Sequence, residues 1–331
     1  MKILSQLLMI ILFTQVSFAQ SPCNEDTIMA IKGKWAKSGG SNSYRAKSPQ
    51  VIIRLDKMVQ LLEAAYPEPK GIEAHWDSEM GRHESLVKNG PLSYDLLASF
   101  KKYYCENIIG NAGNNFKNSY GNKHFLGDET GTWFYVWVNR FGWFAREDGD
   151  FKIDNRQVYT LTPGMGELNG FQVYAGNDGN TPNQYSRTIL ITRTGQLPYT
   201  PVSRKQYLQA FLKEKEANYL RQKGSIPETY YQKEIKAAKE YIANNSDEEL
   251  AKPAYHEGPN HSYDFKKFAD ENKGHMMIQV NESYFNSKLP AYIPQFFVAY
   301  WRWESSKPSL NYAAKIEKNF DFTALQQLLD K

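Results

Sequence analysis

The chain has 331 residues with a formal net charge of +4, 14% aromatic residues and two cysteines. So small a charge, with basic residues spread along the chain rather than clustered, argues against a nucleic-acid partner. No apolar stretch reaches the roughly 20 residues that a transmembrane helix needs, so we expect no membrane-spanning segment.

Residues 1–19 have the layout of a secretory signal peptide. Lys2 provides a positive start, and residues 3–13 are mostly apolar. Ser17 and Ala19 then place small side chains at the −3 and −1 positions of a cleavage site. We therefore predict an exported protein, periplasmic or extracellular, that is cleaved near Ala19. Residues 20–47 are polar and are expected to form a loosely structured lead-in.

Cys23 and Cys105 are the only cysteines of the chain. An isolated pair in an oxidising compartment most simply forms one disulfide, and the alternative is two buried free thiols. Two cysteines cannot complete a four-ligand structural zinc site unaided. We expect a Cys23–Cys105 disulfide that ties the lead-in to the segment before the predicted sheet.

Helical spacing and strand composition define the elements expected in the first two thirds of the chain. Ser48 and Pro49 open a helix, and Pro67 ends it. Residues 94–104 fit either a helix or a strand, and we favour a helix. Aromatic and β-branched residues then predict four strands, at 132–138, 141–146, 171–175 and 188–192.

A pair of charged helices is expected before the last strands. Ser203 and Gln206 form a capping box that starts one helix. Ser225 and Glu228 form a second capping box, which starts the other. The thin apolar stripes of both helices predict that they pack on each other, as a helical pair over residues 203–245. Two strands at 276–280 and 296–303 and a closing helix at 323–329 complete the pattern.

The order of helix, strands, helical pair, strands and helix predicts an α+β fold with a mainly antiparallel sheet packed by helices. We expect residues 48–331 to form a single domain, in which the final strands rejoin the central sheet.

Histidines and carboxylates offer the candidates for metal binding or acid–base chemistry: His75, Glu79, His83, His256 and His261. A spacing of four would place the first three on one face of a helix. The His-Glu-x-x-His arrangement is absent, so we favour a solvated polar stretch and expect no metal and no cofactor. Residues 147–150 are acidic but lack the closing glutamate of a calcium loop. We expect a solvated hairpin turn there.

Aromatic strands provide the candidate ligand-binding residues. Trp133, Tyr135 and Trp137 alternate onto one face of their strand, and the opposite face is also apolar. Strands of this kind are usually central and covered on both sides. The alternative is that one face forms an aromatic platform for sugar rings or peptide side chains. Trp301 and Trp303 form the second candidate set.

The function that we expect is that of an exported, non-enzymatic binding or envelope-associated protein, which contacts a glycan or a peptide through aromatic side chains. One alternative is a secreted hydrolase that uses the histidine and carboxylate groups. A second alternative is a structural or assembly partner that docks through the charged helical pair.

Overall fold

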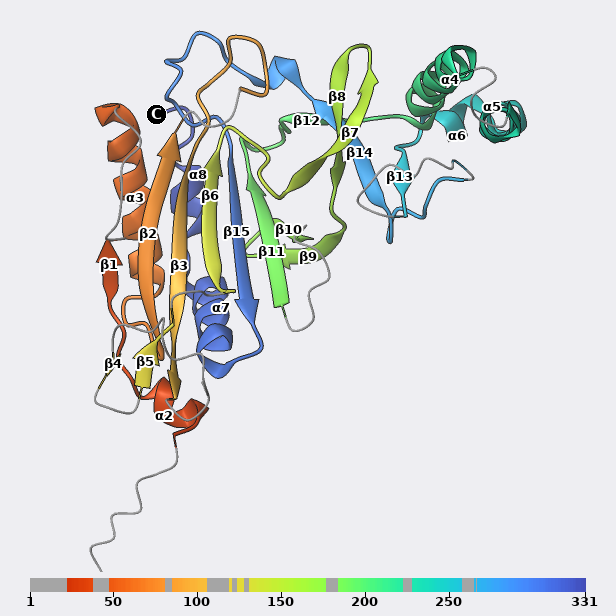
Figure 1. Cartoon of the computed structure of the whole chain (residues 1–331). Coiled ribbons are helices and arrows are strands. Elements are labelled where there is room, and N and C mark those ends of the chain that lie inside the picture. Colours follow the sequence, from red (N-terminus) through yellow and green to blue (C-terminus); the bar gives the residue numbers. More distant parts are fainter. Residues whose placement is uncertain are drawn as a thin grey trace, which may run out of the picture.

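The computed structural model describes residues 23–37, 48–80, 85–105, 119–120, 124–127, 131–176, 184–222, 228–257, 265 and 267–331. Helices and two β-sheets make up this part of the chain, which confirms the predicted α+β fold. Figure 1 shows a large sheet beside a smaller sheet that carries a pair of helices at its far end. The predicted signal peptide, His83, Ser225 and His261 lie outside the described residues.

Ten strands form the large sheet, in the order β1-β2-β3-β6-β15-β11-β10-β9, and β5 joins β4 to the edge of β3. Neighbouring strands are antiparallel except for β1 and β2. β15 lies between β6 and β11, so a strand from near the end of the chain completes the middle of the sheet. The strands are β1 Trp35–Lys37, β2 Ile72–Met80, β3 Tyr94–Cys105, β4 Ser119–Tyr120, β5 His124–Leu126, β6 Trp133–Val138, β9 Gly164–Leu168, β10 Phe171–Ala175, β11 Gln184–Ile191 and β15 Phe297–Glu304.

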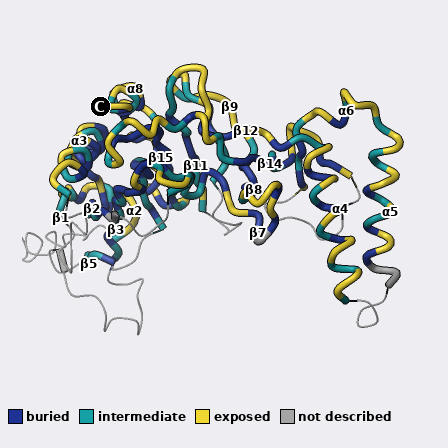
Figure 2. Tube along the Cα trace, turned by 90° about the horizontal axis from the view of Figure 1, so that it is seen from above, coloured by how far each residue is buried: buried dark blue, intermediate teal, exposed yellow. Residues whose placement is uncertain are grey.

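Helices cover one face of the large sheet, and α3 and α8 are seen on that side in Figure 2. The three that pack there are α3 Pro49–Ala65, α7 Lys307–Asn319 and α8 Phe322–Gln326. Tyr312 of α7 is fully buried, with its ring centroid 4.1 Å from that of Phe100. Fully burying an apolar side chain of this kind stabilises the fold by about 1.5–3 kcal/mol, so this face is the main core.

The predicted disulfide is present between Cys23 and Cys105, whose Cα atoms are 5.7 Å apart. It joins the segment before α2 Glu25–Met29 to the last residue of β3. The bond closes a long loop, and on the chain-entropy model such a bond stabilises the fold by about 4 kcal/mol.

The smaller sheet has the order β12-β14-β8-β7, and β13 pairs with β14. Its β7–β8 hairpin reverses at Asp154 and Asn155, whose φ angles are 52° and 61°. Such left-handed backbone is tolerated best by Gly, Asn and Asp, which explains the pair at this turn. The strands are β7 Ala145–Ile153, β8 Arg156–Leu161, β12 Tyr199–Pro201, β13 Tyr255–His256 and β14 His275–Val280, and the 3₁₀ helix Glu282–Tyr284 follows.

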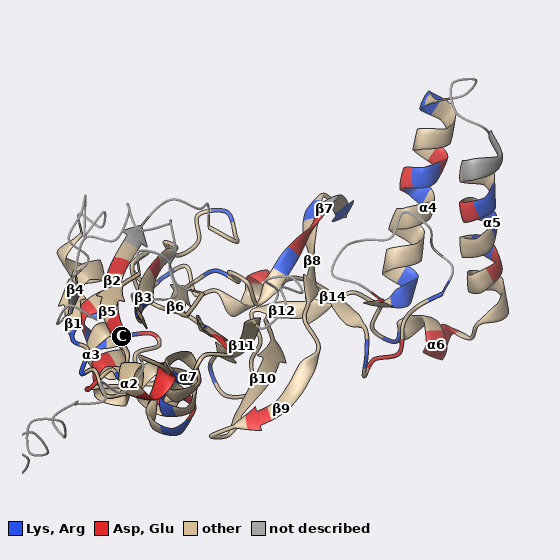
Figure 3. Ribbon diagram, turned by 60° about the horizontal axis from the view of Figure 1, so that its bottom comes forward, with Lys and Arg blue, Asp and Glu red and all other residues tan. Residues whose placement is uncertain are grey.

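The predicted helical pair is confirmed as α4 Arg204–Arg221 and α5 Glu228–Asn244, followed by the short α6 Asp247–Ala251. Ser203 caps α4 as expected: its Oγ accepts from the Gln206 N–H at 3.2 Å, and its own N–H donates to Gln206 Oε1 at 2.9 Å. Charged side chains of both signs lie along α4 and α5 (Figure 3).

Three sequence-based predictions of structure are wrong. Residues 94–104 form strand β3 instead of a helix, because both edges of this segment pair with distant strands, β2 and β6. Residues 141–144 form a turn instead of a strand. Asp148 is 3% exposed inside β7, so residues 147–150 are not a solvated hairpin turn. Helix α7 was not predicted.

The predicted elements α3, β6, β10, β11, β14, β15 and α8 are confirmed. Residues 20–47 were expected to be a loosely structured lead-in, but in their described part residues 25–29 form α2 and residues 35–37 form β1. In the described part of the chain, no helix combines the length and apolar character that a bilayer crossing requires.

Candidate ligand-binding face

Strand β6 presents its two faces to different surroundings. Phe134, Val136 and Val138 are fully buried in the core beneath the helices. Side chains alternate along a strand, so Trp133, Tyr135 and Trp137 lie on the other face of the sheet. We call this the open face, because the described helices α3, α7 and α8 all pack on its opposite side. The smaller sheet covers part of it, since Trp137 and Tyr300 share a core cluster with Tyr159 and Ile278.

Five rings gather on the open face, and we call them the aromatic cluster: Trp133, Tyr135, Trp137, Trp143 and Tyr300. Tyr135 stacks on Trp137 with centroids 4.9 Å apart. Tyr300 lies directly across from Tyr135 on β15, and side chains paired in this way share a face. The Trp143 ring meets that of Tyr300 at 4.7 Å and 75°, an edge-to-face geometry that aromatic pairs favour.

Gly142 lies in the turn after β6 and allows Trp143 to approach the sheet. Its φ is +52°, and a Cβ placed on it would lie 2.2 Å from the ring of Trp137. Only glycine gives both the left-handed backbone and the close approach. The turn therefore holds Trp143 against the cluster.

Two rings of the aromatic cluster are buried, and the other three are partly accessible. Tyr300 is 0% and Trp137 4% exposed, so these two rings are packed in the interior. Trp133, Tyr135 and Trp143 are half-buried. Their accessible parts are held in fixed orientations by the rings beneath them, so little side-chain entropy is lost when a ligand binds.

Charged groups flank the cluster on both sides. The guanidinium of Arg302 lies over the Trp133 ring, 4.8 Å from its centroid. On the side of β3, Arg140 Nη1 is 3.7 Å from Asp95 Oδ2. Asp95 is the register partner of Trp137. The open face thus combines flat apolar rings with hydrogen-bonding groups at the rim.

Farther across the open face, β2 carries a histidine with a carboxylate partner. His75 Nε2 is 3.0 Å from Glu73 Oε1. Burial lowers the pKa of His75 below its ordinary value, and the Glu73 carboxylate opposes this shift. Ser99 of β3 is paired directly with His75. In the described structure, no hydrogen bond joins Ser99 to His75.

The second candidate pair of tryptophans lies on the helix-covered face. Trp301 is fully buried, and its Nε1–H donates to Glu317 Oε1 at 3.3 Å. Trp303 is 8% exposed and stacks on Tyr185, with centroids 5.8 Å apart. We therefore leave Trp301 and Trp303 out of the contact surface.

The structure does not bring the candidate metal residues together where it describes them. His75 lies on β2 of the large sheet, whereas His256 lies on β13 of the smaller one. His256 is 7% exposed, and burial lowers its pKa to about 4. Its Nε2 is 2.9 Å from Met277 Sδ. Glu79 belongs to β2, but its side chain is not among those described.

Two further surfaces lack the features of a binding site. A hollow of about 460 Å³ lies between β10, β11 and α8, and Arg193 is the charged residue of its lining. Arg193 is held by Asp330 at 2.6 Å and by the Tyr284 carbonyl at 2.7 Å, so it serves the fold.

Among the described side chains of α4 and α5, Leu220 is the one large apolar group that is exposed. The helical pair therefore offers no broad apolar docking patch in its described part.

Sequence reasoning missed Trp143, Tyr300 and Arg302 as members of this face. Alternation along β15 places Tyr300 and Arg302 on one side of the strand, but nothing in the sequence indicates that this side is the open one. The only sequence feature that could have placed Trp143 on this face is the neighbouring Gly142. The conformation of Gly142 was not predictable from the local pattern.

Comparison with known proteins gives no match: no protein-family model fits the chain, and no curated protein or solved structure is significantly similar to it.

Proposed function

We propose that the protein is an exported, non-enzymatic carbohydrate-binding protein, and that the aromatic cluster on the open face of the large sheet is its binding site. The observation that carries the proposal is the partial exposure of Trp133, Tyr135 and Trp143 over a fully buried aromatic floor. Sugar rings offer apolar C–H faces that pack on such flat rings, and their hydroxyl groups seek hydrogen bonds at the edges.

The charged rim supports a sugar more than a purely apolar ligand. Arg302 lies over Trp133 and donates N–H groups, and the carboxylate of Asp95 accepts hydrogen bonds. A few polar groups around apolar rings are the usual composition of a small-ligand site. An extended peptide would use the same rings, and it is the second ligand class to test.

Export is the other part of the proposal. It rests on the signal-peptide pattern of residues 1–19 and on the Cys23–Cys105 disulfide, which is typical of oxidising compartments. Mass spectrometry of the mature N-terminus tests it. We expect a chain that begins after Ala19, and an exported fraction that retains Met1 would contradict the expectation.

Binding is tested on a panel of immobilised oligosaccharides and peptides with single alanine variants. Trp133→Ala and Trp143→Ala are each expected to weaken retention of the bound sugar by at least about tenfold, because central aromatic contacts commonly contribute more than 1.4 kcal/mol. Tyr185→Ala is the matched control: Tyr185 is 49% exposed and stacks on Trp303, on the opposite face of the same sheet.

Circular dichroism and the unfolding midpoint show whether each variant is folded. Equal retention of the wild type and of folded Trp133→Ala and Trp143→Ala would refute the site. Retention of peptides alone, lost in the same variants, would reassign the ligand class.

A second candidate function, hydrolysis, is favoured by the contact between His75 and Glu73 across from Ser99. Nucleophilic catalysis uses a carboxylate, a histidine and a hydroxyl group in a row, and these three groups lie on neighbouring strands here, although Ser99 does not hydrogen-bond to His75 in the described structure. Release of reducing ends from a bound glycan, abolished by His75→Ala with binding retained, would establish this function in place of the first.

A further inference from the structure

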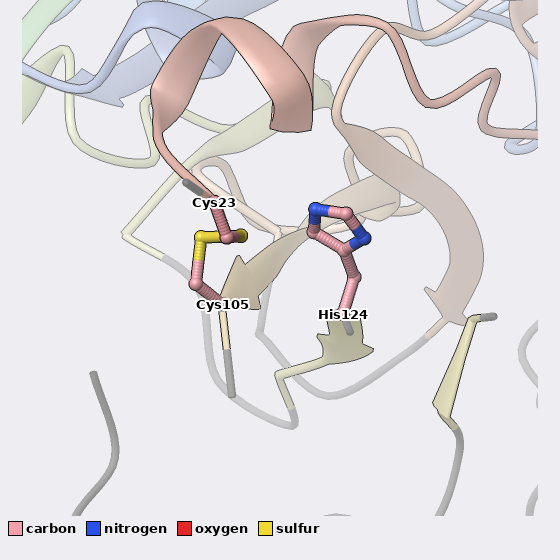
Figure 4. Close-up of side chains that lie close together, drawn as sticks. All are labelled: Cys23, Cys105 and His124. Carbon is pink, nitrogen blue, oxygen red and sulfur yellow. A yellow bond between two sulfur atoms is a disulfide. The ribbon is translucent and has the colours of Figure 1, made fainter. Parts of the chain in front are cut away.

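Three potential metal ligands lie together at the end of the large sheet opposite the helical pair: Cys23, Cys105 and His124 (Figure 4). Their ligand atoms are all within 4.8 Å of one another. Cys105 and His124 are direct register partners on β3 and β5, and the disulfide brings Cys23 to the same place. The cluster is thus held by strand pairing as well as by the covalent bond.

The histidine of this cluster has an unused nitrogen. Nε2 of His124 is buried and has no hydrogen-bond partner in the described structure. Leaving a buried polar atom unpaired costs about 1–3 kcal/mol. The surroundings do not compensate for it, because Cys105 packs with Ile28, Ile31 and Tyr103 in an apolar cluster. An imidazole beside two sulfur atoms in such surroundings has the chemistry of a soft metal site.

We propose that reduction of the Cys23–Cys105 disulfide converts this cluster into a three-ligand binding site for a soft divalent cation, with Zn²⁺ as its representative. The proposal does not depend on the carbohydrate-binding function. While the disulfide is intact, neither sulfur is a thiolate, so the site is closed to the metal. The sequence shows no ligand spacing typical of a zinc site, because the two cysteines and the histidine come from three separate elements.

The chemistry balances with a dithiol as the reductant. The dithiol gives two electrons and two protons, the S–S bond breaks, and the reductant leaves as its own disulfide. Cys23 and Cys105 then lose one proton each as their thiolates bind Zn²⁺. Neutral His124 contributes a nitrogen lone pair, so binding releases two protons in all.

The geometry is compatible with the metal after a small movement. With Zn–S bonds of about 2.3 Å and tetrahedral angles, two zinc-bound sulfur atoms lie about 3.8 Å apart. Cys23 belongs to the segment before α2, so this separation requires only that one short segment shifts. Three protein ligands leave a fourth position for water. In either state the segment before α2 stays attached to β3 and β5.

Equilibrium dialysis against Zn²⁺ tests the proposal with the full chain, in the oxidised form and after reduction by a phosphine. We expect about one zinc ion per reduced chain, as for a site with three protein ligands, and no stoichiometric zinc on the oxidised chain. Cobalt added to the reduced protein should give a thiolate-to-metal charge-transfer band in the near ultraviolet. Circular dichroism of the same sample checks that the reduced protein is folded.

Variants separate this site from adventitious binding. Cys23→Ser is expected to abolish the charge-transfer band of a cysteine pair, and His124→Gln to weaken zinc binding by about tenfold or more. His275→Gln is the matched control, since His275 is a half-buried histidine on β14 of the smaller sheet. Zinc binding by reduced wild type no tighter than by Cys23→Ser, or unchanged affinity in His124→Gln, would overturn the proposal.

Discussion

The large sheet and the helical pair differ in where they place charged side chains. In the large sheet, charges lie at the rim of the open face, as in the Arg140–Asp95 pair, whose side chains are 19% and 12% exposed. In the helical pair, Lys215 of α4 and Glu234 of α5 meet at 2.7 Å, with side chains only 3% and 5% exposed. The first pair keeps part of its surface accessible, whereas the second is almost fully buried.

This difference indicates separate roles for charge in the two regions. Burying an ion pair costs desolvation energy that its attraction barely repays, so we expect the Lys215–Glu234 pair to specify how α4 and α5 meet more than to add stability. The aromatic side chains follow the same division. The rings around Tyr207 of α4 form a closed core, with Phe211, Phe265 and Phe268 as neighbours. By contrast, Tyr135 and two of its neighbouring rings, Trp133 and Trp143, are partly accessible.

Replacing one tryptophan on each face of the large sheet by alanine is expected to give the largest difference in stability between the two faces. Trp301→Ala, on the helix-covered face, is expected to lower the free energy of unfolding by about 5 kcal/mol, because it leaves a large cavity in a fully buried site. Trp133→Ala, on the open face, should cost much less because the ring is half-buried. Urea unfolding followed by fluorescence measures both, and equal losses would mean that the open face is core.

The role of the buried ion pair is tested by removing one partner and then both. Lys215→Met removes the ammonium group that lies 2.7 Å from the buried Glu234 carboxylate, and we expect a loss of about 4 kcal/mol. The double variant Lys215→Met/Glu234→Leu should recover most of this loss. A double variant as unstable as the single one would show that the pair stabilises the helical pair outright.

The buried histidine of the smaller sheet predicts how stability depends on pH. The folded chain binds a proton at His256 with a pKa of about 4, below the ordinary value of 6.5. The unfolded chain therefore binds the proton more strongly, and this contribution is lost as the pH falls from 6.5 to 4. At about 1.4 kcal/mol per pH unit, the loss approaches 3 kcal/mol.

The residues that surround His256 include a second histidine, which provides the control variant. It lies against Met277 and the ring of Tyr207, and His275 is its cross-strand partner, whose pKa burial also lowers. His256→Leu should flatten the stability profile between pH 4 and pH 6.5, and His275→Gln should change it less. Denaturation midpoints across this range measure the effect, and parallel profiles for wild type and His256→Leu would disprove the assignment.

The smallest expected effect concerns the start of α4. Ser203→Ala removes the oxygen that accepts the Gln206 N–H, and the loss of such a cap costs about 1 kcal/mol. Ser246→Ala is a matched comparison, because Ser246 caps α6 by accepting the Glu249 N–H at 3.2 Å. Thermal unfolding detects both, and an unchanged midpoint for Ser203→Ala would mean that the cap is replaced by water.

Local sequence signals predicted elements well where one pattern dominated. Ser48 and Pro49 located α3, and Ser203 located α4. The helix predicted for residues 94–104 is wrong because Leu96 and Leu97 are adjacent apolar residues. Adjacent apolar residues fit a helix as well as a strand. The strand is selected by pairing with β2 and β6, and that information is not local.

The candidate site was predictable only in part, for a similar reason. Alternation along β6 correctly grouped Trp133, Tyr135 and Trp137, because it depends only on strand geometry. Which face is covered depends on α3, α7 and α8, which come from opposite ends of the chain. Trp143 joins the cluster through the backbone of Gly142, and tertiary packing against Trp137 fixes that conformation.

The position of β15 sets the moment at which the large sheet closes during synthesis. Its neighbours are complete at Val138 and Ile191, but β15 begins only at Phe297. At typical elongation rates the earlier strands wait on the order of ten seconds for it, each with an unpaired edge. Until about the last tenth of the chain has been made, β6 and β11 therefore each keep an edge that can pair with other chains. A truncation before Phe297 would leave two half-sheets that no remaining strand can join.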